Sequence, residues 1–245
     1  MEPYRKILYT TPQIAFVVVD LKPGDKIDMG VLKHTTQFIC VESGVVVVKT
    51  ASRAEYDGDG DGGDGDGVIT PQFKKHRLEE GDSITIPPEM LHVATAQKNG
   101  AKMYILYSSP KRRPATTIQN GDIAAFKNRI DKTTLQNTFY RKVIHTTPQM
   151  QLVVMSLKPG EKIDMEIHKH TTQFIRVVHG SVCAETTLPR SKMVHHHLKS
   201  GGGIIIPPDT LHMVTAQENG AKMYTIYSPP EHPPGTIQRR PPLSS

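Results

Sequence analysis

Four polar side chains in the C-terminal half of the chain have the residue types of a metal site. Glu166 and His168 are two residues apart, Gln173 follows shortly after them, and His212 comes later in the chain. Two imidazoles, one carboxylate and one amide oxygen suit a borderline divalent ion such as zinc, iron, manganese or nickel. We therefore predict one divalent transition metal per chain, with these four side chains as its ligands. Glu166 is also the candidate catalytic residue, because a carboxylate that the metal leaves free can act as a general base.

Strand geometry gives these residues a reason to converge. Residues two apart on a strand share a face, so Glu166 and His168 are expected on the same side. Gln173 is expected on the next strand, beyond a turn at Thr171-Thr172, and His212 on a facing strand. In a small barrel that side can be the interior. A hydrogen-bonded polar lining without metal is the alternative that the residues leave open, because buried polar groups need partners in either case.

The chain repeats itself, and the repeat defines the elements that must position the candidate ligands. The sequence from Tyr4 reads YRKILYTTPQIAFVVVDLKPGDKIDM and returns from Tyr140 as YRKVIHTTPQMQLVVMSLKPGEKIDM. The sequence from Ile84 reads ITIPPEMLHVATAQKNGAKMYILYSSP and returns from Ile204 as IIIPPDTLHMVTAQENGAKMYTIYSPP. The second pair of matches is closer together than the first, so copy one carries an insertion, mainly the Asp/Gly tract 57–67. We predict an N-terminal domain at 1–119, a linker at 120–139 and a C-terminal domain at 140–245.

Each copy has the pattern of an all-β domain. Runs such as FVVVDL, FICV and VVVV alternate with Pro-Gly, Asn-Gly and Gly-Asp breakers, which is typical of a sandwich or a barrel. We predict two tandem jelly-roll barrels, because closure removes exposed strand edges in a small all-β domain. In the linker, Ile123, Phe126 and Ile130 have helical spacing after Asp122, which predicts a short helix.

The segment from Gly160 to Gly180 resembles the first sequence motif of the cupin superfamily, whose members fold as double-stranded β-helix barrels. The first cupin motif is Gly-x5-His-x-His-x4-Glu-x6-Gly. Copy two keeps this spacing at Gly160, Glu166, His168, Gln173 and Gly180. Glu replaces the first histidine of the motif and Gln replaces its glutamate, so we expect weaker metal affinity than in cupins with three histidines and one glutamate.

The second cupin motif, Gly-x5-Pro-x-Gly-x2-His-x3-Asn, is kept in part. Copy two has its Gly201, Pro207 and His212, with Asp209 and Ala216 in place of the second glycine and the asparagine. The phrases KPGEKIDMEIHKHTTQF and YSPPEHPPGTIQ also resemble small bacterial cupins that are labelled mannose-6-phosphate isomerase-like. The resemblance covers nearly all of both copies and implies a tandem bicupin, but it does not identify a substrate.

Copy one has lost half of this ligand set. Gly30 and Leu32 stand where copy two has its glutamate and first histidine, while Gln37 and His92 are kept and His34 is a substitute donor. We expect the first barrel to be a packing partner rather than a metal site, because the single cupins that it resembles commonly pair as dimers. A homodimer of the whole chain is left open.

Composition and charge narrow the function classes. The net charge is +6 and the pI is about 9.2, but the basic residues are spread out and no nucleic-acid reader motif accompanies them, so no nucleic-acid partner is expected. No apolar run is long enough to span a bilayer, and the N-terminal sequence lacks the pattern of a secretory signal. Cys40 and Cys183 do not correspond in the repeat, which argues against a disulfide framework. We therefore expect a cytoplasmic protein with a small-molecule partner and no membrane association.

Three further features of the sequence have residue types that occur in metal or ligand sites. Adjacent residues on a strand alternate faces, so we expect the run 195–197 of three histidines to be an exposed loop that binds metal only adventitiously. The tract 57–62 resembles the opening of a calcium loop, but Val68 stands where a bidentate Glu is required, which favours a flexible hairpin insertion. Tyr224 and Tyr227 are three apart and cannot both face the barrel interior.

Two hypotheses for function follow from the sequence. The first is a metal-dependent enzyme, of isomerase or dioxygenase type, that acts on a small polar metabolite such as a sugar or sugar phosphate. The second is a non-catalytic bicupin that binds a small ligand or serves a structural or interaction role, because one barrel hosts many functions.

Overall fold

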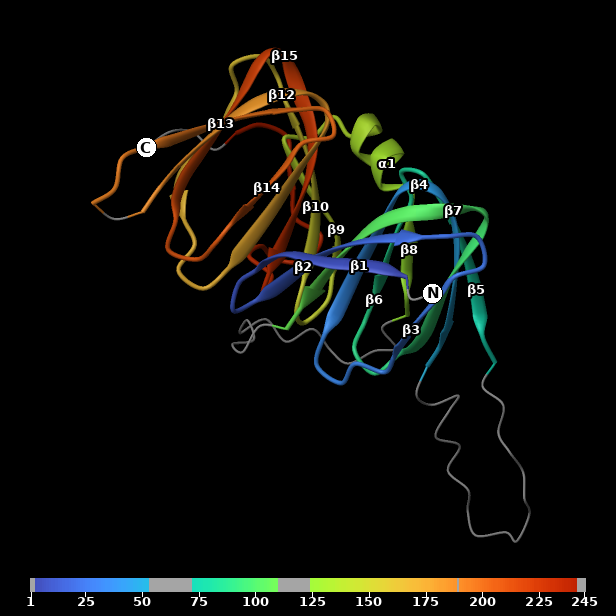
Figure 1. Ribbon diagram of the computed structural model, residues 1–245. Coiled ribbons are helices and arrows are strands. Elements are labelled where there is room, and N and C mark those ends of the chain that lie inside the picture. The colour runs from blue at the N-terminus through green and yellow to red at the C-terminus, as the bar shows by residue number, and fades with distance from the viewer. Residues whose placement is uncertain (1–2, 53–71, 110–123, 189, 242–245) are drawn as a thin grey trace, which may run out of the picture. The chain divides into compact units, whose positions relative to one another are not determined.

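The computed structural model describes residues 3–52, 72–109, 124–188 and 190–241 (Figure 1). The chain divides into two compact units, one built mainly from Ala15–Tyr107 and the other mainly from Arg129–Ser245. The short segment Thr10–Ile14 belongs to the second unit. The Asp/Gly tract 57–67 and the connector up to residue 123, including Ile123, lie outside the described residues.

The N-terminal unit contains one antiparallel sheet, with eight strands among the described residues. Six strands follow one another in space in the order β1 (Tyr4–Thr10), β2 (Ile14–Leu21), β7 (Leu91–Ser108), β4 (Thr36–Ala51), β6 (Ser83–Ile86) and β8 (Phe126–Asn128). The other two strands pair beside this path, and they are β3 (Lys26–Gly30) on β7 and β5 (Lys74–Glu79) on β4.

The C-terminal unit repeats this arrangement, again with eight strands in the described part. The path runs through β13 (Val194–Lys199), β12 (Thr172–Thr187), β15 (Leu211–Ser228), β10 (Gln151–Leu157), β9 (Arg141–Thr146) and β16 (Ile237–Gln238). The strands off this path are β11 (Lys162–Ile167) on β15 and β14 (Gly203–Ile206) on β12. Figure 1 shows the strands of each unit curling around their own interior. The prediction of two tandem all-β cupin-type barrels is confirmed.

Period-two alternation builds each core. On β10, Val153, Met155 and Leu157 belong to the core cluster of the C-terminal unit and are at most 3% exposed. Val143 on β9 lies opposite Val153 and joins the same cluster. Because side chains alternate across a strand, the residues in register with these positions also face the barrel interior.

The last glycine of the first motif has a steric role. Gly180 has a φ of 78°, and a Cβ atom there would lie 2.0 Å from the carbonyl oxygen of Gly220. Copy one repeats this contact, with 2.2 Å between a Cβ at Gly44 and the carbonyl oxygen of Gly100. Any side chain at this bend would push β12 away from β15, so both copies need glycine there.

Two local predictions were wrong. The helix predicted around Phe126 lies later, because Phe126–Asn128 pairs as β8 with β6 and the helix α1 spans Ile130–Gln136. The segment Phe126–Asn128 belongs to a pattern with helical spacing, but it pairs with the edge of the sheet instead. The histidine run is not a loop, because Val194–Lys199 pairs with β12 as β13. Among the described residues, no helix is long and apolar enough to cross a membrane.

Candidate metal centre

Glu166 and His212 face each other across two paired strands. They are register partners on β11 and β15, close to the end of β11. His168 follows one residue beyond that strand, where its carbonyl accepts a hydrogen bond of 2.9 Å from the backbone of Asp209. Asp209 has a φ of 60°, the left-handed conformation that favours glycine, at the place where the cupin motif has a glycine. The backbone thus holds both histidines beside Glu166.

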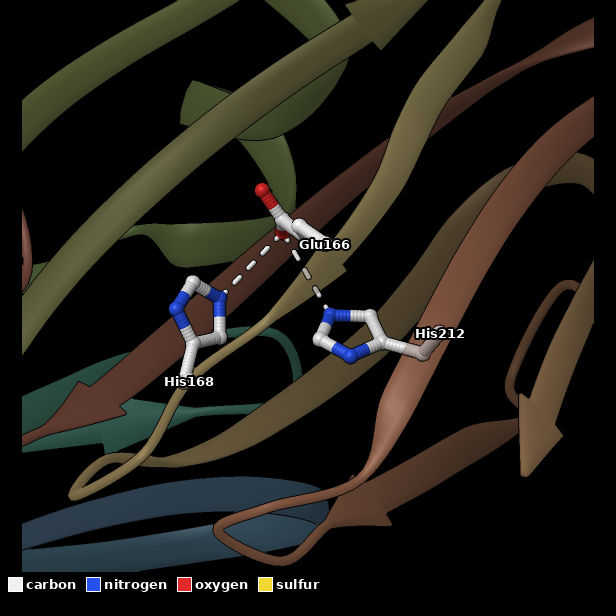
Figure 2. Close-up of side chains that lie close together, drawn as sticks. All are labelled: Glu166, His168 and His212. Atoms are coloured by element: carbon white, nitrogen blue, oxygen red, sulfur yellow. Dashed lines mark hydrogen bonds and ion pairs between the residues drawn. The ribbon is translucent and has the colours of Figure 1, made fainter. Parts of the chain in front are cut away.

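The three ligand atoms converge at metal-site spacing. Glu166 Oε1 lies 3.3 Å from His168 Nε2 and 3.4 Å from His212 Nε2 (Figure 2). Ligand atoms of a tetrahedral ion with bonds of about 2.0–2.1 Å lie roughly 3.3 Å apart. The ligand atoms of the three residues all lie within 4.8 Å of one another. Their arrangement therefore leaves a common point for one ion.

The hydrogen bonding of His212 fixes which ring nitrogen can bind a cation. His212 is fully buried, and its Nδ1 lies 2.9 Å from the carbonyl oxygen of Thr210, to which it donates. Nε2 therefore carries a lone pair, and this buried atom has no hydrogen-bond partner. Since the facing carboxylate oxygen is also an acceptor, a cation between the two atoms is what would satisfy both. The donor set fits a divalent metal ion.

A second carboxylate, which sequence reasoning missed, orients His168. The Nδ1 atom of His168 lies 3.2 Å from Glu231 Oε1, and Thr171 Oγ1 donates to Glu231 Oε2 at 2.7 Å. Donation from Nδ1 to Glu231 leaves Nε2 facing Glu166, the arrangement that protein metal sites use to set the imidazole tautomer. The signal in the sequence was a difference between the copies, because Lys111 stands at the matching position of copy one.

The charges of the site also favour a cation. Burial raises the pKa of Glu166, but the adjacent imidazoles of His168 and His212 outweigh burial and hold the pKa well below its usual range. Burial lowers the pKa of His168, but its hydrogen bonds with Glu166 and Glu231 raise it to about 9. Without metal, His168 is therefore an imidazolium between two carboxylates at neutral pH. A metal ion must displace its proton.

Gln173 lies beside this trio, in contact with a tyrosine. Its Nε2 donates to the hydroxyl of Tyr227 at 3.0 Å, and its buried Oε1 has no hydrogen-bond partner. The ring of Tyr227 packs edge-on against the ring of His168, with centroids 5.7 Å apart. Gln173 thus presents an unsatisfied acceptor, and its role as the fourth ligand stays a prediction. Tyr224 packs on Phe174 instead, so only one of the two tyrosines serves the site.

His232 and Gln151 complete the surroundings of Tyr227. The ring of His232 packs edge-on against Tyr227 with centroids 5.2 Å apart. The Gln151 amide donates to the carbonyl of His232 at 2.7 Å and accepts from its backbone N–H at 3.0 Å. Burial lowers the pKa of His232 to about 4, so this ring is neutral. Neither residue was predicted, because their contact forms only when the segment after β15 folds against Gln151 on β10.

A comparison with protein families gives this architecture its identity. Residues 8–143, more than half of the chain, match the cupin family model. The chain belongs to the cupin family.

Two curated relatives share part of the sequence. An uncharacterized protein of Acanthamoeba polyphaga mimivirus is 47% identical over 113 residues, which cover 45% of this chain and 69% of that protein. The uncharacterized protein YrkC of Bacillus subtilis (strain 168) is 33% identical over 110 residues, which cover 44% of this chain and 59% of that protein. Each match is about one cupin repeat long.

Solved structures show the same fold across both copies. A cupin 2 conserved barrel domain protein from Leptotrichia buccalis has a TM-score of 0.62 at 13% identity and covers 93% of this chain and 89% of its own. A variant of oxalate decarboxylase from Bacillus subtilis has a TM-score of 0.60 at 11% identity and covers 93% of this chain and 73% of its own. At these identities the likeness shows the fold alone.

The first cupin barrel lacks the converging set. Gly30 is the register partner of His92, so no carboxylate stands directly opposite this histidine on β3. The amide Nε2 of Gln37 lies 2.8 Å from His92 Nε2, and His92 Nδ1 lies 3.0 Å from the carbonyl of Met90. His34 is exposed and does not replace the missing ligand. Among the described residues, only Glu166, His168 and His212 form a preformed group of three acidic, histidine or cysteine ligands.

Proposed function

We propose that the C-terminal cupin barrel binds one divalent transition-metal ion and acts on a small polar metabolite. The observation that carries the proposal is the buried, unpartnered Nε2 of His212, which lies 3.4 Å from a carboxylate oxygen whose pKa is strongly lowered. Glu166, His168 and His212 would hold the ion, with the amide oxygen of Gln173 as the fourth protein ligand. When bound, the ion supplies Lewis-acid polarisation of a substrate oxygen or, if it is iron, activation of dioxygen.

The chain's own residues would divide the remaining work. Glu231 orients His168 through Nδ1 and keeps Nε2 directed at the ion. The hydroxyl of Tyr227, bonded to Gln173, is buried and its pKa is raised by burial, so it stays protonated and can donate a hydrogen bond. Glu166 is partly exposed, with 28% of its side chain accessible, so a carboxylate oxygen that the ion leaves free can act as a base toward a substrate.

The substrate class rests on sequence resemblance. The phrases KPGEKIDMEIHKHTTQF and YSPPEHPPGTIQ resemble cupins that are labelled mannose-6-phosphate isomerase-like, and a sugar or sugar phosphate is the substrate class that this label suggests without identifying it. Isomerase and dioxygenase chemistry are the two reaction types that this ligand set suits. Oxalate decarboxylase shares the fold of the chain, and its substrate carries no weight at 11% identity.

A non-catalytic bicupin is the second candidate. Two observations favour it: a neutral amide at Gln173 replaces the family's carboxylate, and the first barrel satisfies His92 with Gln37 instead of metal. In that case the barrels bind a small ligand, or serve an interaction role, without chemistry.

Metal content separates these candidates. Protein without a histidine tag would be purified and its metals counted by mass spectrometry, for the wild type and for His168→Ala and His212→Ala. We expect one equivalent fewer in each variant. The matched control is His92→Ala, which alters the equivalent histidine of the first barrel and should retain that equivalent. Equal metal content in wild type and both site variants, after reconstitution with several ions, contradicts the proposal.

A further inference from the structure

The outer face of the β12–β13 ribbon gathers a second set of metal-binding side chains. Register pairs Cys183 with His197 and Glu185 with His195. Directly paired residues share a face of the sheet, and residues two apart on one strand share it too. These four side chains therefore form a square on one face of the C-terminal unit. The neighbours Val182, Ala184 and Leu198 have the opposite parity and pack in or against the core, so the square faces outward.

Two of these side chains, Glu185 and Cys183, both contact the third, His195. His195 Nδ1 lies 3.1 Å from Glu185 Oε1 and 4.0 Å from the sulfur of Cys183. Around a tetrahedral zinc ion, nitrogen and oxygen ligands lie roughly 3.3 Å apart and nitrogen and sulfur ligands roughly 3.6 Å apart. The carboxylate is thus at ligand spacing from His195, whereas the thiol must move closer to both of these groups, because the three atoms do not all lie within 4.8 Å of one another. The His195 side chain is 54% exposed, so its ring has room to adjust.

His196, between the two outward-facing histidines, has a different environment. His196 points the other way, and its Nε2 lies 3.0 Å from Thr186 Oγ1. Copy one has the same inward pair, His76 and Thr50, also at 3.0 Å. The inward contact is thus common to both copies, whereas the outward histidines need another explanation.

Copy one shows that the fold itself does not require the outward set. The register partners at the matching positions are Val47 with Arg77 and Lys49 with Lys75. An apolar residue and three cations cannot bind a metal. The thiol, carboxylate and two imidazoles therefore belong to copy two alone, on a ribbon whose backbone is otherwise the same.

We propose that Cys183, Glu185, His195 and His197 form a second metal site, outside the barrel, for a thiolate-preferring divalent ion such as zinc or cobalt. Binding releases the thiol proton of Cys183, because the thiolate is the form that coordinates. Sulfur and imidazole ligands select zinc and cobalt over calcium or magnesium. The site is independent of the barrel centre, which has no sulfur ligand.

The sulfur gives the site a spectroscopic signature of its own. The reduced, untagged full chain carrying His168→Ala and His212→Ala, which remove the barrel centre, would be titrated with cobalt(II). We expect a thiolate-to-cobalt charge-transfer band in the near ultraviolet that saturates at one equivalent. Cys183→Ser should abolish the band, and Glu185→Gln or His195→Ala should weaken cobalt binding at least tenfold.

His196→Ala is the matched control, because it removes a histidine of the same strand that faces inward. It should leave the cobalt affinity unchanged. A band that is absent in the presence of excess cobalt, that survives Cys183→Ser, or that is insensitive to both His195→Ala and His197→Ala overturns the proposal. Because the barrel ligands are removed beforehand, these outcomes are separate from those of the barrel metal measurement. Circular dichroism of each variant checks that β13 remains folded.

Discussion

The two barrels contain the same arginine, glutamine, histidine and tyrosine but connect them differently. In the first barrel, Gln37 pairs with His92 at 2.8 Å, and Arg5 donates to Tyr107 at 2.8 Å. In the second barrel, the corresponding glutamine donates to Tyr227 and the corresponding histidine faces Glu166. The Nε2 lone pair that pairs with an amide in the first barrel has no hydrogen-bond partner in the second.

This difference in hydrogen bonding follows from two residues at the end of one strand. Where the second copy has Glu166 and His168, the first has Gly30 and Leu32. A buried imidazole nitrogen must find a partner, so the loss of the carboxylate leaves His92 to the nearest amide. The comparison teaches that a site can be lost at two positions while its remaining ligands stay in place and become structural.

The arginines diverge in the same way. Arg141 corresponds to Arg5 but is only 8% exposed, and its Nη1 donates to Gln238 on β16 at 3.1 Å. In the described residues of the first unit, Arg5 lies on β1, whose side chains are all exposed. Tyr227 accepts a hydrogen bond from Gln173 instead, which leaves the amide oxygen of Gln173 without a hydrogen-bond partner.

Removing the carboxylate of Glu166 should reduce the difference between the two barrels more than any other change. In Glu166→Gln the metal loses its anionic ligand, and we expect metal affinity to fall by more than about 100-fold, because changes to residues that only orient a ligand already cost about 10–100-fold. Isothermal titration with zinc or manganese measures the change. Asp164→Asn, an exposed carboxylate on the same strand, is the charge-matched control. Equal affinities for the two variants would mean that Glu166 is not a ligand.

The pH dependence of metal-free protein should separate the histidines of the two barrels. The raised pKa of His168, about 9, means that its protonated form stabilises the fold fully below pH 6.5 and that this stabilisation is lost as pH rises to about 9. We expect the free-energy advantage of the wild type over His168→Gln to shrink by on the order of 2 kcal/mol across that range. Chemical denaturation at several pH values measures it.

Histidine NMR provides the check on the first barrel. His92 has a pKa below 6.5 because it is buried, so it should titrate on the acid side of neutrality, opposite to His168. If His92 and His168 titrate over the same pH range, the difference in hydrogen bonding between the two barrels does not exist in solution.

A smaller loss is expected from Glu231→Gln, which weakens the orientation of His168 without removing a ligand. Metal affinity should fall by about 10–100-fold, as for other residues that hold a metal ligand in position by a hydrogen bond. Glu218→Gln, on an exposed stretch of β15, controls for the change of charge. Metal affinity that stays at the wild-type value would mean that Glu231 contacts His168 only in the metal-free protein and does not orient it for metal binding.

The smallest effect should come from the glutamines, and it should differ between barrels. Gln37→Leu leaves the lone pair of His92 buried without a partner, which costs about 1–3 kcal/mol of stability but no metal. Gln173→Leu should lower metal affinity as well, because it removes the predicted amide ligand. Thermal unfolding and metal titration of both variants test this, and a loss of metal in Gln37→Leu would be the contrary result.

The repeat and the fold could be predicted from local pattern. Alternating apolar residues, glycines such as Gly180 and the spacing of Glu166, His168 and His212 are properties of short stretches, and strands that share a hydrophobic face have one way to bury it. The pairing of Glu166 with His212 required only that β11 and β15 meet in the register that the motif implies.

Other features depended on contacts between segments that local pattern does not encode. Glu231 reaches His168 from a loop, Gln173 turns to Tyr227, Phe126 joins a sheet edge, and Cys183 meets His195 through strand register. Loop paths and side-chain partners are set by which polar groups remain unsatisfied once the core has closed, so only the tertiary structure decides them. The sequence by itself determined two cupin barrels and the identity of three converging residues, and the folded chain decided how each of those residues is oriented.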